Sequence, residues 1–329
     1  MSAPPNPTAS AGARARDLPG TPADGKRVWT YRHAMTPAEM PSKLLVIGSG
    51  AIGIEFASFY NTMGADTTVV EVMDRVLPVE DEEISAFAKK QFVKQGMTIL
   101  EKATVKKLDR AKDKVTAHIE VGGKVQTQEF DTVISAVGIV GNVEDCGFEE
   151  AGLKIDRTHV VVDEYCRTGV DGVYAIGDVI GGAMLAHKAE EEGIALAERL
   201  AGAAGHVDYG TIPAVVYTWP ELASVGRTED DLKAAGVAYR VGRFPFSANA
   251  MAKARLEKNG LVKVLADART DKILGVHILG PDAGSLIHEA VAVMQFGAAA
   301  EDDLANRPSH HGEGEDHDHD DFETVALPV

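Results

Sequence analysis

The most regular hydrophobic pattern of the chain lies in residues 43–71, where two apolar runs flank a helix-like segment. The first run, Leu44–Ile47, is short and continuous, which is typical of a buried parallel strand. Apolar residues then recur at helical spacing up to Tyr60, and a second apolar run, Thr67–Val70, follows. This order predicts a strand, a helix and a second parallel strand, which together form a βαβ unit.

Three glycines join the first strand to the helix. Gly48, Gly50 and Gly53 have G-x-G-x-x-G spacing. In a dinucleotide-binding unit the first permits the tight turn, the second lets a pyrophosphate approach the backbone, and the third lets helix and strand pack closely. The helix N-terminus then presents unpaired N–H groups to the phosphates. A glycine-rich turn of an ordinary α/β domain is the alternative, because the spacing alone is weak evidence.

An acid closes the second strand. Glu71 lies 18 residues after Gly53, where a carboxylate accepts hydrogen bonds from the adenosine ribose. A 2′-phosphate at the same place would meet a like charge. The pattern therefore predicts a site for NAD rather than NADP.

Further hydrophobic patterns predict the remaining elements of this first domain. Helical spacing predicts a helix over residues 82–95 that ends at Gly96, and Met97–Leu100 predicts a short strand. Three alternating runs predict a β-meander, and a buried strand is expected after it. These segments are Thr104–Asp109, Lys114–Val121 and Lys124–Phe130, with a hairpin turn at Gly122 and Gly123, and then Thr132–Val137.

The second half of the chain divides in two by pattern. Residues 160–163 and 173–176 are strand-like, and Met184–Leu200 has helical spacing. Residues 208–304 alternate between strand and helix patterns, which predicts an α+β domain. Its expected strands lie near 213–217, 223–226, 238–245, 260–267 and 273–279, and its expected helices near 228–236 and 282–296.

Composition limits the possible functions. The chain has 329 residues and a formal net charge of −17, which argues against nucleic acid and anionic membranes as partners. Its two cysteines, Cys146 and Cys166, are too far apart for a CxxC or CxxxxC motif and are expected to be reduced thiols. No apolar stretch approaches the length of a membrane span. We expect a cytoplasmic protein, with a weak transit-peptide character of the first 16 residues as the alternative.

Several motifs together resemble one family. GSGAIGIEFASFY with TVVE, ISAVG, GVYAIGD, MLAHKAEEEG, VVYTWPELASVGRTE and ILGVHILGP are similar to segments of dihydrolipoamide dehydrogenase, within the flavoprotein disulfide reductases. The resemblance runs from about Ala11 to Leu304. It implies an α/β fold with a Rossmann-like NAD-binding domain and β-meander, a partial FAD-binding domain, and an α+β interface domain for dimerisation.

The resemblance also implies cofactor residues. Glu55 matches a helix acid that pairs with a lysine beside the flavin, with a solvated or simply capping glutamate as the alternative. His187 would contribute mostly its backbone, with a general base or a metal ligand as the alternative. Asp178 matches the acid that hydrogen-bonds the polyol of FAD, with an ordinary acid at a strand-end turn as the alternative. The implied NAD residues are Gly48, Ser49, Gly50, Ala51, Ile52, Gly53, Glu55, Glu71, Val105 and Gly138, and the implied FAD residues are Asp178, Met184, Leu185, Ala186 and His187.

Two departures from the family pattern bear on activity. The flavin-binding GxGxxG unit and the redox C-x-x-x-x-C that open a family member do not occur in this sequence. The family's H-x-H-P-T-x-S-E segment is replaced by NRPSHHGEGEDHDHDD, in which only His310 and Glu315 retain the spacing of the acid/base dyad. We therefore expect no catalytic residues beyond that weak dyad, and a chain that is inactive alone.

The histidines of the acidic tail are the remaining metal-binding candidates. His310, His311, His317 and His319 could chelate a metal ion loosely, and a solvated acidic tail is the alternative. We assign no metal site. The expected domains are residues 1–25 (a poorly ordered remnant of the FAD domain), 26–142 (NAD-binding), 143–207 (partial FAD-binding), 208–305 (dimerisation) and 306–329 (flexible acidic tail).

The implied activity is NAD-dependent oxidation of protein-bound dihydrolipoamide through FAD and a redox disulfide. The implied partners are the lipoyl domain of 2-oxo acid dehydrogenase complexes and a second copy of the chain in a weakened homodimer. The alternative is a truncated NAD(H)-binding module without catalysis. FAD is expected to bind weakly or not at all.

Overall fold

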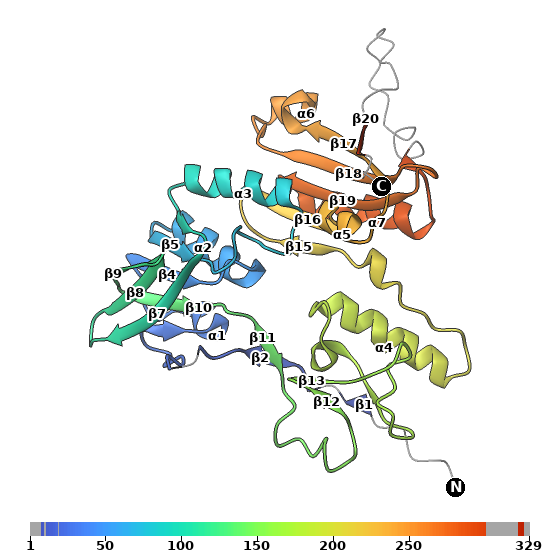
Figure 1. The fold of residues 1–329 in the computed structure, drawn as a ribbon, viewed down its shortest axis with the longest axis horizontal. Helices are drawn as coiled ribbons and strands as arrows, with labels where there is room; N and C mark the ends of the chain where they lie inside the picture. Colours follow the sequence, from blue (N-terminus) through green and yellow to red (C-terminus); the bar gives the residue numbers. More distant parts are fainter. Residues whose placement is uncertain (1–7, 10, 19, 301–321, 326–329) are drawn as a thin grey trace. The chain divides into compact units, whose positions relative to one another are not determined.

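The computed structural model describes residues 8–9, 11–18, 20–300 and 322–325. The chain divides into two compact units (Figure 1). Unit 1 comprises Met1–Asp17 and Val137–Ile212, and unit 2 comprises Leu18–Ala136 and Pro213–Val329.

A five-stranded parallel sheet forms the first part of unit 2. Its strand order is β3-β10-β4-β5-β6, and every pairing is parallel. The strands are Val28–Trp29 (β3), Thr132–Ser135 (β10), Lys43–Ile47 (β4), Asp66–Val70 (β5) and Thr98–Leu100 (β6), and the helices are Tyr31–Ala34 (α1), Ala51–Thr62 (α2) and Glu82–Lys94 (α3). The predicted βαβ unit is confirmed as β4-α2-β5. The short β3 and α1 were not predicted.

The predicted meander is confirmed as an antiparallel sheet of three strands. These are Ala103–Arg110 (β7), Val115–Val121 (β8) and Lys124–Phe130 (β9). Gly122 and Gly123 both have positive φ, +58° and +77°, as the tight hairpin between β8 and β9 requires.

A six-stranded antiparallel sheet forms the second part of unit 2. Its order is β15-β16-β19-β18-β17-β20. The strands are Ala214–Val216 (β15), Glu221–Gly226 (β16), Ile273–Gly280 (β19), Leu261–Asp267 (β18), Tyr239–Pro245 (β17) and Phe322–Val325 (β20), and the helices are Glu229–Ala234 (α5), Phe246–Ala248 (η3), Ala250–Ala254 (α6) and Ala283–Gln295 (α7). The strand β20 lies within the segment that was expected to be a flexible tail.

The two sheets of unit 2 share one hydrophobic core. Leu44 and Ile54 from the parallel part belong to the same buried cluster as Leu222 and Leu279 from the antiparallel part. A second buried cluster lies between the antiparallel sheet and α7, where Ile287 is fully buried. Apolar burial therefore joins the predicted NAD-binding fold to the predicted interface fold within this unit.

Unit 1 is built from short strands and one long helix. Thr8–Ala9 (β1) pairs parallel with Tyr174–Ala175 (β14), and Ala13–Ala15 (β2) pairs antiparallel with Ile139–Gly141 (β11). The other elements are Ile155–Asp156 (β12), His159–Val160 (β13), Gly177–Ile180 (η1), Ala186–Leu200 (α4) and Tyr209–Thr211 (η2). The predicted strand over 160–163 is shorter than expected, since β13 ends at Val160.

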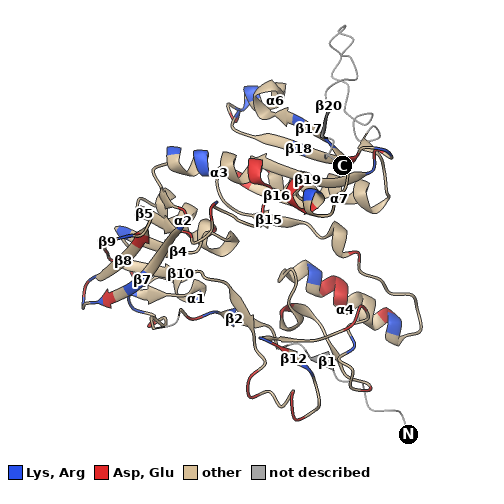
Figure 2. Cartoon of the chain, in the orientation of Figure 1, with Lys and Arg blue, Asp and Glu red and all other residues tan. Residues whose placement is uncertain are grey.

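A buried charge cluster connects α3 to the antiparallel sheet of unit 2. The fully buried ammonium of Lys263 lies 2.7 Å from Asp81 Oδ1, 2.9 Å from Glu229 Oε2 and 3.1 Å from Glu83 Oε2. Asp81 also caps α3, because its side chain accepts from the N–H of Glu83. The acids of α3 gather at its first turn and the lysines toward its other end, as the helix dipole favours (Figure 2).

Opposing effects set the pKa of Asp81. Burial raises it, but the hydrogen bond and the positive charge of Lys263 outweigh burial and hold the pKa below its usual value. A carboxyl whose pKa is lower in the folded state stabilises the fold above its unfolded pKa. This contribution is lost as the pH falls through the lower, folded-state pKa.

Removal of Lys263 should destabilise unit 2 strongly. The Lys263→Met change leaves Asp81 and Glu229 without their buried cation, and such a loss costs about 3–5 kcal/mol. Lys233→Met is the matched control, because Lys233 lies 4.0 Å from the same Glu229 carboxylate but is exposed. It should cost less than about 0.5 kcal/mol. Urea unfolding measures both, and equal losses would contradict the assignment.

Candidate functional site

The glycine loop between β4 and α2 has the conformation that its sequence predicts. Gly48 has a φ of +97°, which an L-residue adopts only with strain. A Cβ on Gly53 would lie 2.0 Å from the carbonyl oxygen of Gly48. Gly50 is the N-cap of α2, and a Cβ there would meet nothing within 4 Å. The loop therefore packs tightly behind Gly53 and is open in front of Gly50.

The first turn of α2 faces that open space with its backbone. The first intrahelical bond runs from the N–H of Ile54 to the carbonyl of Gly50. The N–H groups of Ala51, Ile52 and Gly53 precede it and have no partner inside the helix. The first turn carries no acidic side chain. These features make the helix start a suitable place for a phosphate group.

Glu71 holds the loop from the end of β5. It is 5% exposed, and its Oε2 accepts hydrogen bonds from Ser49 N at 2.8 Å and Ser49 Oγ at 2.7 Å. Its Oε1 accepts from the N–H of Met73 at 2.8 Å. A carboxylate has about four acceptor positions, so Oε1 can accept one more bond. Glu71 can thus position the loop and still receive a ribose hydroxyl.

The sequence did not predict the hydrogen bonds between Ser49 and Glu71. Ser49 was assigned only as part of the glycine loop, and Glu71 only as a ribose acceptor. A serine between the first two glycines, followed by an acid at the end of the next strand, is the signal that points to such a bond. Leu77 adds to the same anchor, because its N–H donates to the carbonyl of Ser49 at 3.0 Å.

Glu55 and Val105 belong to the same unit as the glycine loop. Glu55 lies on α2 itself, and Val105 lies on β7, whose first residue donates its N–H to the carbonyl of Glu71 at 2.9 Å. Glu55 is partly buried in α2 and accepts the N–H of Tyr217 at 2.8 Å, so its partner is a backbone amide at the end of β15. Burial raises its pKa, and the bond from Tyr217 opposes that rise. Val105 is partly buried on β7, next to a bulge between Val105 and Lys107.

Gly138 belongs to unit 1 rather than to the unit of the glycine loop. Its φ is +103°, and its carbonyl accepts the N–H of Arg16 at 3.0 Å. The structure therefore brings together Gly48–Gly53 and Glu71, while Gly138 is held in place by the strand pair of β2 and β11.

The candidate flavin residues lie on a turn and a helix start in unit 1. Asp178 is partly buried in η1, and its carbonyl accepts the N–H of Gly181. Leu185 is the N-cap of α4, so Met184 and Leu185 precede the helix, whereas Ala186 and His187 open it. No side chain caps this end. The helix thus presents backbone N–H groups and a positive dipole end, as expected for a site that receives negative charge.

A buried ion pair holds the turn that carries Asp178. Lys188, 2% exposed, lies 3.0 Å from Glu192, which is fully buried. Lys188 Nζ also donates to the carbonyl of Gly181 at 2.9 Å, and Glu192 Oε2 accepts the N–H of Gly177 at 2.8 Å. The two side chains thereby fix both ends of the turn.

Tyr209 completes this network. Its hydroxyl donates to Glu192 Oε1 at 3.0 Å. Burial and the neighbouring Glu192 carboxylate raise the pKa of Tyr209. Burial first, and then the same carboxylate, also raise the pKa of the Cys166 thiol, which favours its neutral form. Cys146 is exposed, and both cysteines are free thiols.

Other predicted features lie outside these sites. His310 and Glu315 are outside the described residues. Across residues 8–9, 11–18, 20–300 and 322–325, no cluster of three His, Cys, Asp or Glu side chains is placed to hold a metal ion. Within the same ranges, none of the helices combines the length and apolar character that a membrane span requires.

Two family models match the chain. Residues 9–193 match the pyridine nucleotide-disulphide oxidoreductase model, and residues 212–312 match the dimerisation domain of that family. The chain belongs to the pyridine nucleotide-disulphide oxidoreductase family. The family resemblance seen in the sequence motifs is thus confirmed, as is the predicted fold.

Curated relatives in this family carry the name dihydrolipoyl dehydrogenase. One from Rhizobium etli is 49% identical over 294 residues, which cover 88% of this chain and 61% of the relative. The mitochondrial one from Pisum sativum is 45% identical, with 88% and 59% covered. The chain therefore spans about three fifths of the length of these relatives.

Solved structures of the family have the same fold. LpdA from Mycobacterium tuberculosis is 30% identical with a TM-score of 0.84, and the match covers 92% of this chain and 65% of that one. The HOCl-induced flavoprotein disulfide reductase RclA from Escherichia coli is 25% identical with a TM-score of 0.83, covering 93% and 70%.

Substitutions at two glycines of the loop should affect folding and NADH binding separately. Gly53→Ala places a Cβ against the Gly48 carbonyl, and overpacking of this kind costs about 1–3 kcal/mol. In Gly50→Val the added side chain projects into open space, so the variant should lose little stability but bind NADH at least tenfold more weakly. Urea unfolding and NADH fluorescence titration measure the two effects. A Gly50→Val protein that binds NADH normally would contradict the site.

The buried ion pair of unit 1 gives a second prediction. Lys188→Met should destabilise unit 1 by about 3–5 kcal/mol, because it leaves the carboxylate of Glu192 without its cation. Lys154→Met, which alters an exposed lysine of the same unit, is the control and should change stability by less than about 0.5 kcal/mol. Amide hydrogen exchange across Gly177–Ile180 reads out the turn, and unchanged protection in Lys188→Met would refute the positioning role.

Proposed function

We propose that this chain contributes to NAD-dependent oxidation of a protein-bound dihydrolipoyl group, as its relatives' name, dihydrolipoyl dehydrogenase, suggests. The observation that carries the proposal is the Glu71 carboxylate, which anchors the glycine loop and keeps one acceptor position for a ribose. The substrate would be the lipoyl domain of a 2-oxo acid dehydrogenase complex. The alternative is an NAD(H)-binding module without catalysis.

The residues of the glycine loop fit NAD. The N–H groups at the start of α2 would bind the pyrophosphate, and the open space at Gly50 would let it approach the backbone. Glu71 would accept a ribose hydroxyl. Its negative charge would repel the 2′-phosphate of NADP, which supports the NAD preference expected from sequence.

The residues of unit 1 fit part of an FAD site. Asp178 would accept a hydroxyl of the polyol chain, and the uncapped start of α4 at Ala186 would favour negative charge nearby. Met184, Leu185 and His187 would contribute mainly through their backbone. When bound, FAD supplies two-electron chemistry between a dithiol and a nicotinamide. Lys188 and Glu192 keep the Asp178 turn in position for it.

The redox disulfide is not assigned to the two cysteines of this chain. The thiolate is the reactive form of cysteine, and burial favours the neutral thiol at Cys166. Cys146 is exposed but lies 20 positions away in sequence. The inactivity of the chain alone therefore stays a prediction.

Pairing of two copies is part of the proposal. Residues 212–312 match the family's dimerisation domain, which supports a homodimer. On α7, Leu286 is 43% exposed, and Phe296 at its C-cap is 90% exposed. A partner could cover such side chains. The domain limits 1–25, 26–142, 143–207, 208–305 and 306–329 and the cytoplasmic location likewise stay predictions.

Comparison of NADH and NADPH tests the cofactor assignment. We expect NADH to bind at least tenfold more tightly than NADPH in fluorescence titrations. Glu71→Gln removes the charge but keeps the size of the side chain, so it should reduce this preference. A wild-type preference for NADPH would contradict the role of Glu71 and the proposed function.

Flavin absorption and turnover test the catalytic part. We expect the purified chain to hold less than stoichiometric FAD and to show no NADH formation from NAD and dihydrolipoamide. Stoichiometric FAD with turnover would overturn the expected inactivity of the chain alone and favour the dehydrogenase over the binding module. Absence of NADH binding would contradict both.

A further inference from the structure

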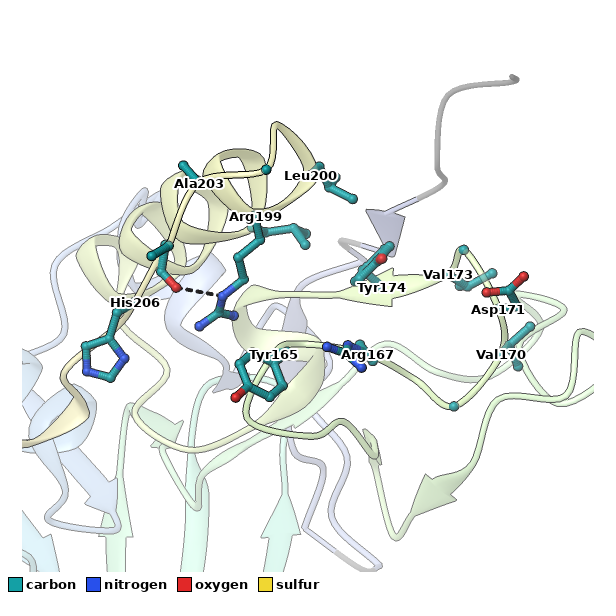
Figure 3. Close-up of a pocket in the computed structure, with 16 residues that line it drawn as sticks. Tyr165, Arg167, Val170, Asp171, Val173, Tyr174, Arg199, Leu200, Ala203 and His206 are labelled. Atoms are coloured by element: carbon teal, nitrogen blue, oxygen red, sulfur yellow. Dashed lines mark hydrogen bonds between the residues drawn. The ribbon is translucent and has the colours of Figure 1, made fainter. Parts of the chain in front are cut away.

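Unit 1 contains a cavity that none of the assigned cofactor residues lines. Its volume is about 940 Å³, and it lies between the C-terminal end of α4 with the following loop and the segment of residues 165–174 (Figure 3). Cavities of this size hold small organic molecules. Its polar wall includes Tyr165, Arg167, Arg199 and His206, and its apolar wall includes Leu196, Leu200 and Val173.

Two guanidinium groups each make a cation–π contact with the same aromatic ring in this cavity. The Cζ atoms of Arg167 and Arg199 each lie 4.8 Å from the centroid of the Tyr165 ring. The two cations are therefore no more than twice that distance apart. Figure 3 shows both side chains directed toward Tyr165 from different elements, Arg199 from α4 and Arg167 from the strand-like segment below it. The ring attracts both cations, while the two like charges repel each other.

The guanidinium of Arg199 uses few of its donors on the protein. Its Nε donates to the carbonyl of Gly205 at 2.7 Å, and one terminal nitrogen reaches the carbonyl of Glu164 at 3.5 Å. Both acceptors are neutral backbone groups. An arginine has five N–H donors, so several stay available to a ligand.

Arg167 is likewise without a hydrogen-bonded carboxylate among the described residues. Its Nε lies 3.8 Å from Asp163, beyond hydrogen-bond distance, and that pair is exposed. Asp171 also lines the cavity, but Figure 3 shows it at the end away from Arg199. Two cations thus stand together, with their charge incompletely balanced, in a chain whose net charge is −17.

An anion between the two guanidiniums would relieve their repulsion and take up their free donors. Planar guanidinium groups bind phosphate oxygens through paired N–H bonds. The apolar wall of Leu196, Leu200 and Val173 would cover an apolar or ring-shaped part of the same molecule. We propose that this cavity binds a small organic phosphate, with the phosphate at Arg167 and Arg199. This inference does not depend on the proposed function.

Phenyl phosphate is the probe for this site, because it joins a ring to a phosphate. Isothermal titration calorimetry should show one binding site per chain, with weaker binding of inorganic phosphate and none of phenol. Arg167→Gln and Arg199→Gln should each weaken the binding at least tenfold. Arg167 is the safer variant for folding, because its side chain is 60% exposed.

Two controls keep the result specific. Arg14→Gln removes an exposed arginine of the same unit that pairs with Glu144, and it should bind phenyl phosphate as the wild type does. Gly50→Val should also bind it normally, which excludes the start of α2 as the source of the signal. Equal affinity in the wild type and in both arginine variants would overturn the proposal, as would equal binding of phenol.

Discussion

The hydrogen bonds from Ser49 to the buried carboxylate of Glu71 are the constraint on which the dinucleotide site depends. They tie the glycine loop after β4 to the end of the neighbouring strand β5. A buried carboxylate is costly unless donors surround it, and here two backbone N–H groups and one hydroxyl do so. The loop is thereby held in one conformation before any ligand arrives, so binding need not order it.

In unit 1 a buried carboxylate likewise holds a glycine-containing turn in place. Glu192 is fully buried, and it accepts the N–H of Gly177 as Glu71 accepts that of Ser49. The difference is the buried cation, because Lys188 balances Glu192 whereas no cation is hydrogen-bonded to Glu71 among the described residues. In both units a helix or strand supplies an acid that fixes a glycine turn. In our proposal, the glycine loop would bind NAD and the Asp178 turn would bind FAD.

Local pattern predicted most of the strands and helices, and pairing over long sequence distances accounts for what was missed. The glycine spacing and the apolar runs around it depend on neighbouring residues, so β4, α2 and β5 could be predicted. The strands β3 and β2 are only two and three residues long and form by pairing with β10 and β11, more than a hundred positions later. Such short segments carry no periodicity of their own.

The candidate sites show the same division. The positions of Gly48, Gly50 and Gly53 followed from the sequence, because each answers a local steric requirement. The partner of Glu55 did not, because Tyr217 lies 162 positions away and contributes only its backbone. The cluster around Lys263 joins residues 182 positions apart, and its lysine stands in an ordinary strand pattern. Sequence alone offered no sign that this lysine would be buried.

A crystal structure of the chain bound to NADH would show directly whether the glycine loop and Glu71 form the dinucleotide site. We expect the pyrophosphate at the N–H groups of the first turn of α2, in front of Gly50. We also expect a ribose hydroxyl to donate to Glu71 Oε1 while Ser49 keeps its bonds to Oε2. A dinucleotide bound elsewhere, or a Glu71 carboxylate turned away from Ser49 and the ribose, would contradict this assignment.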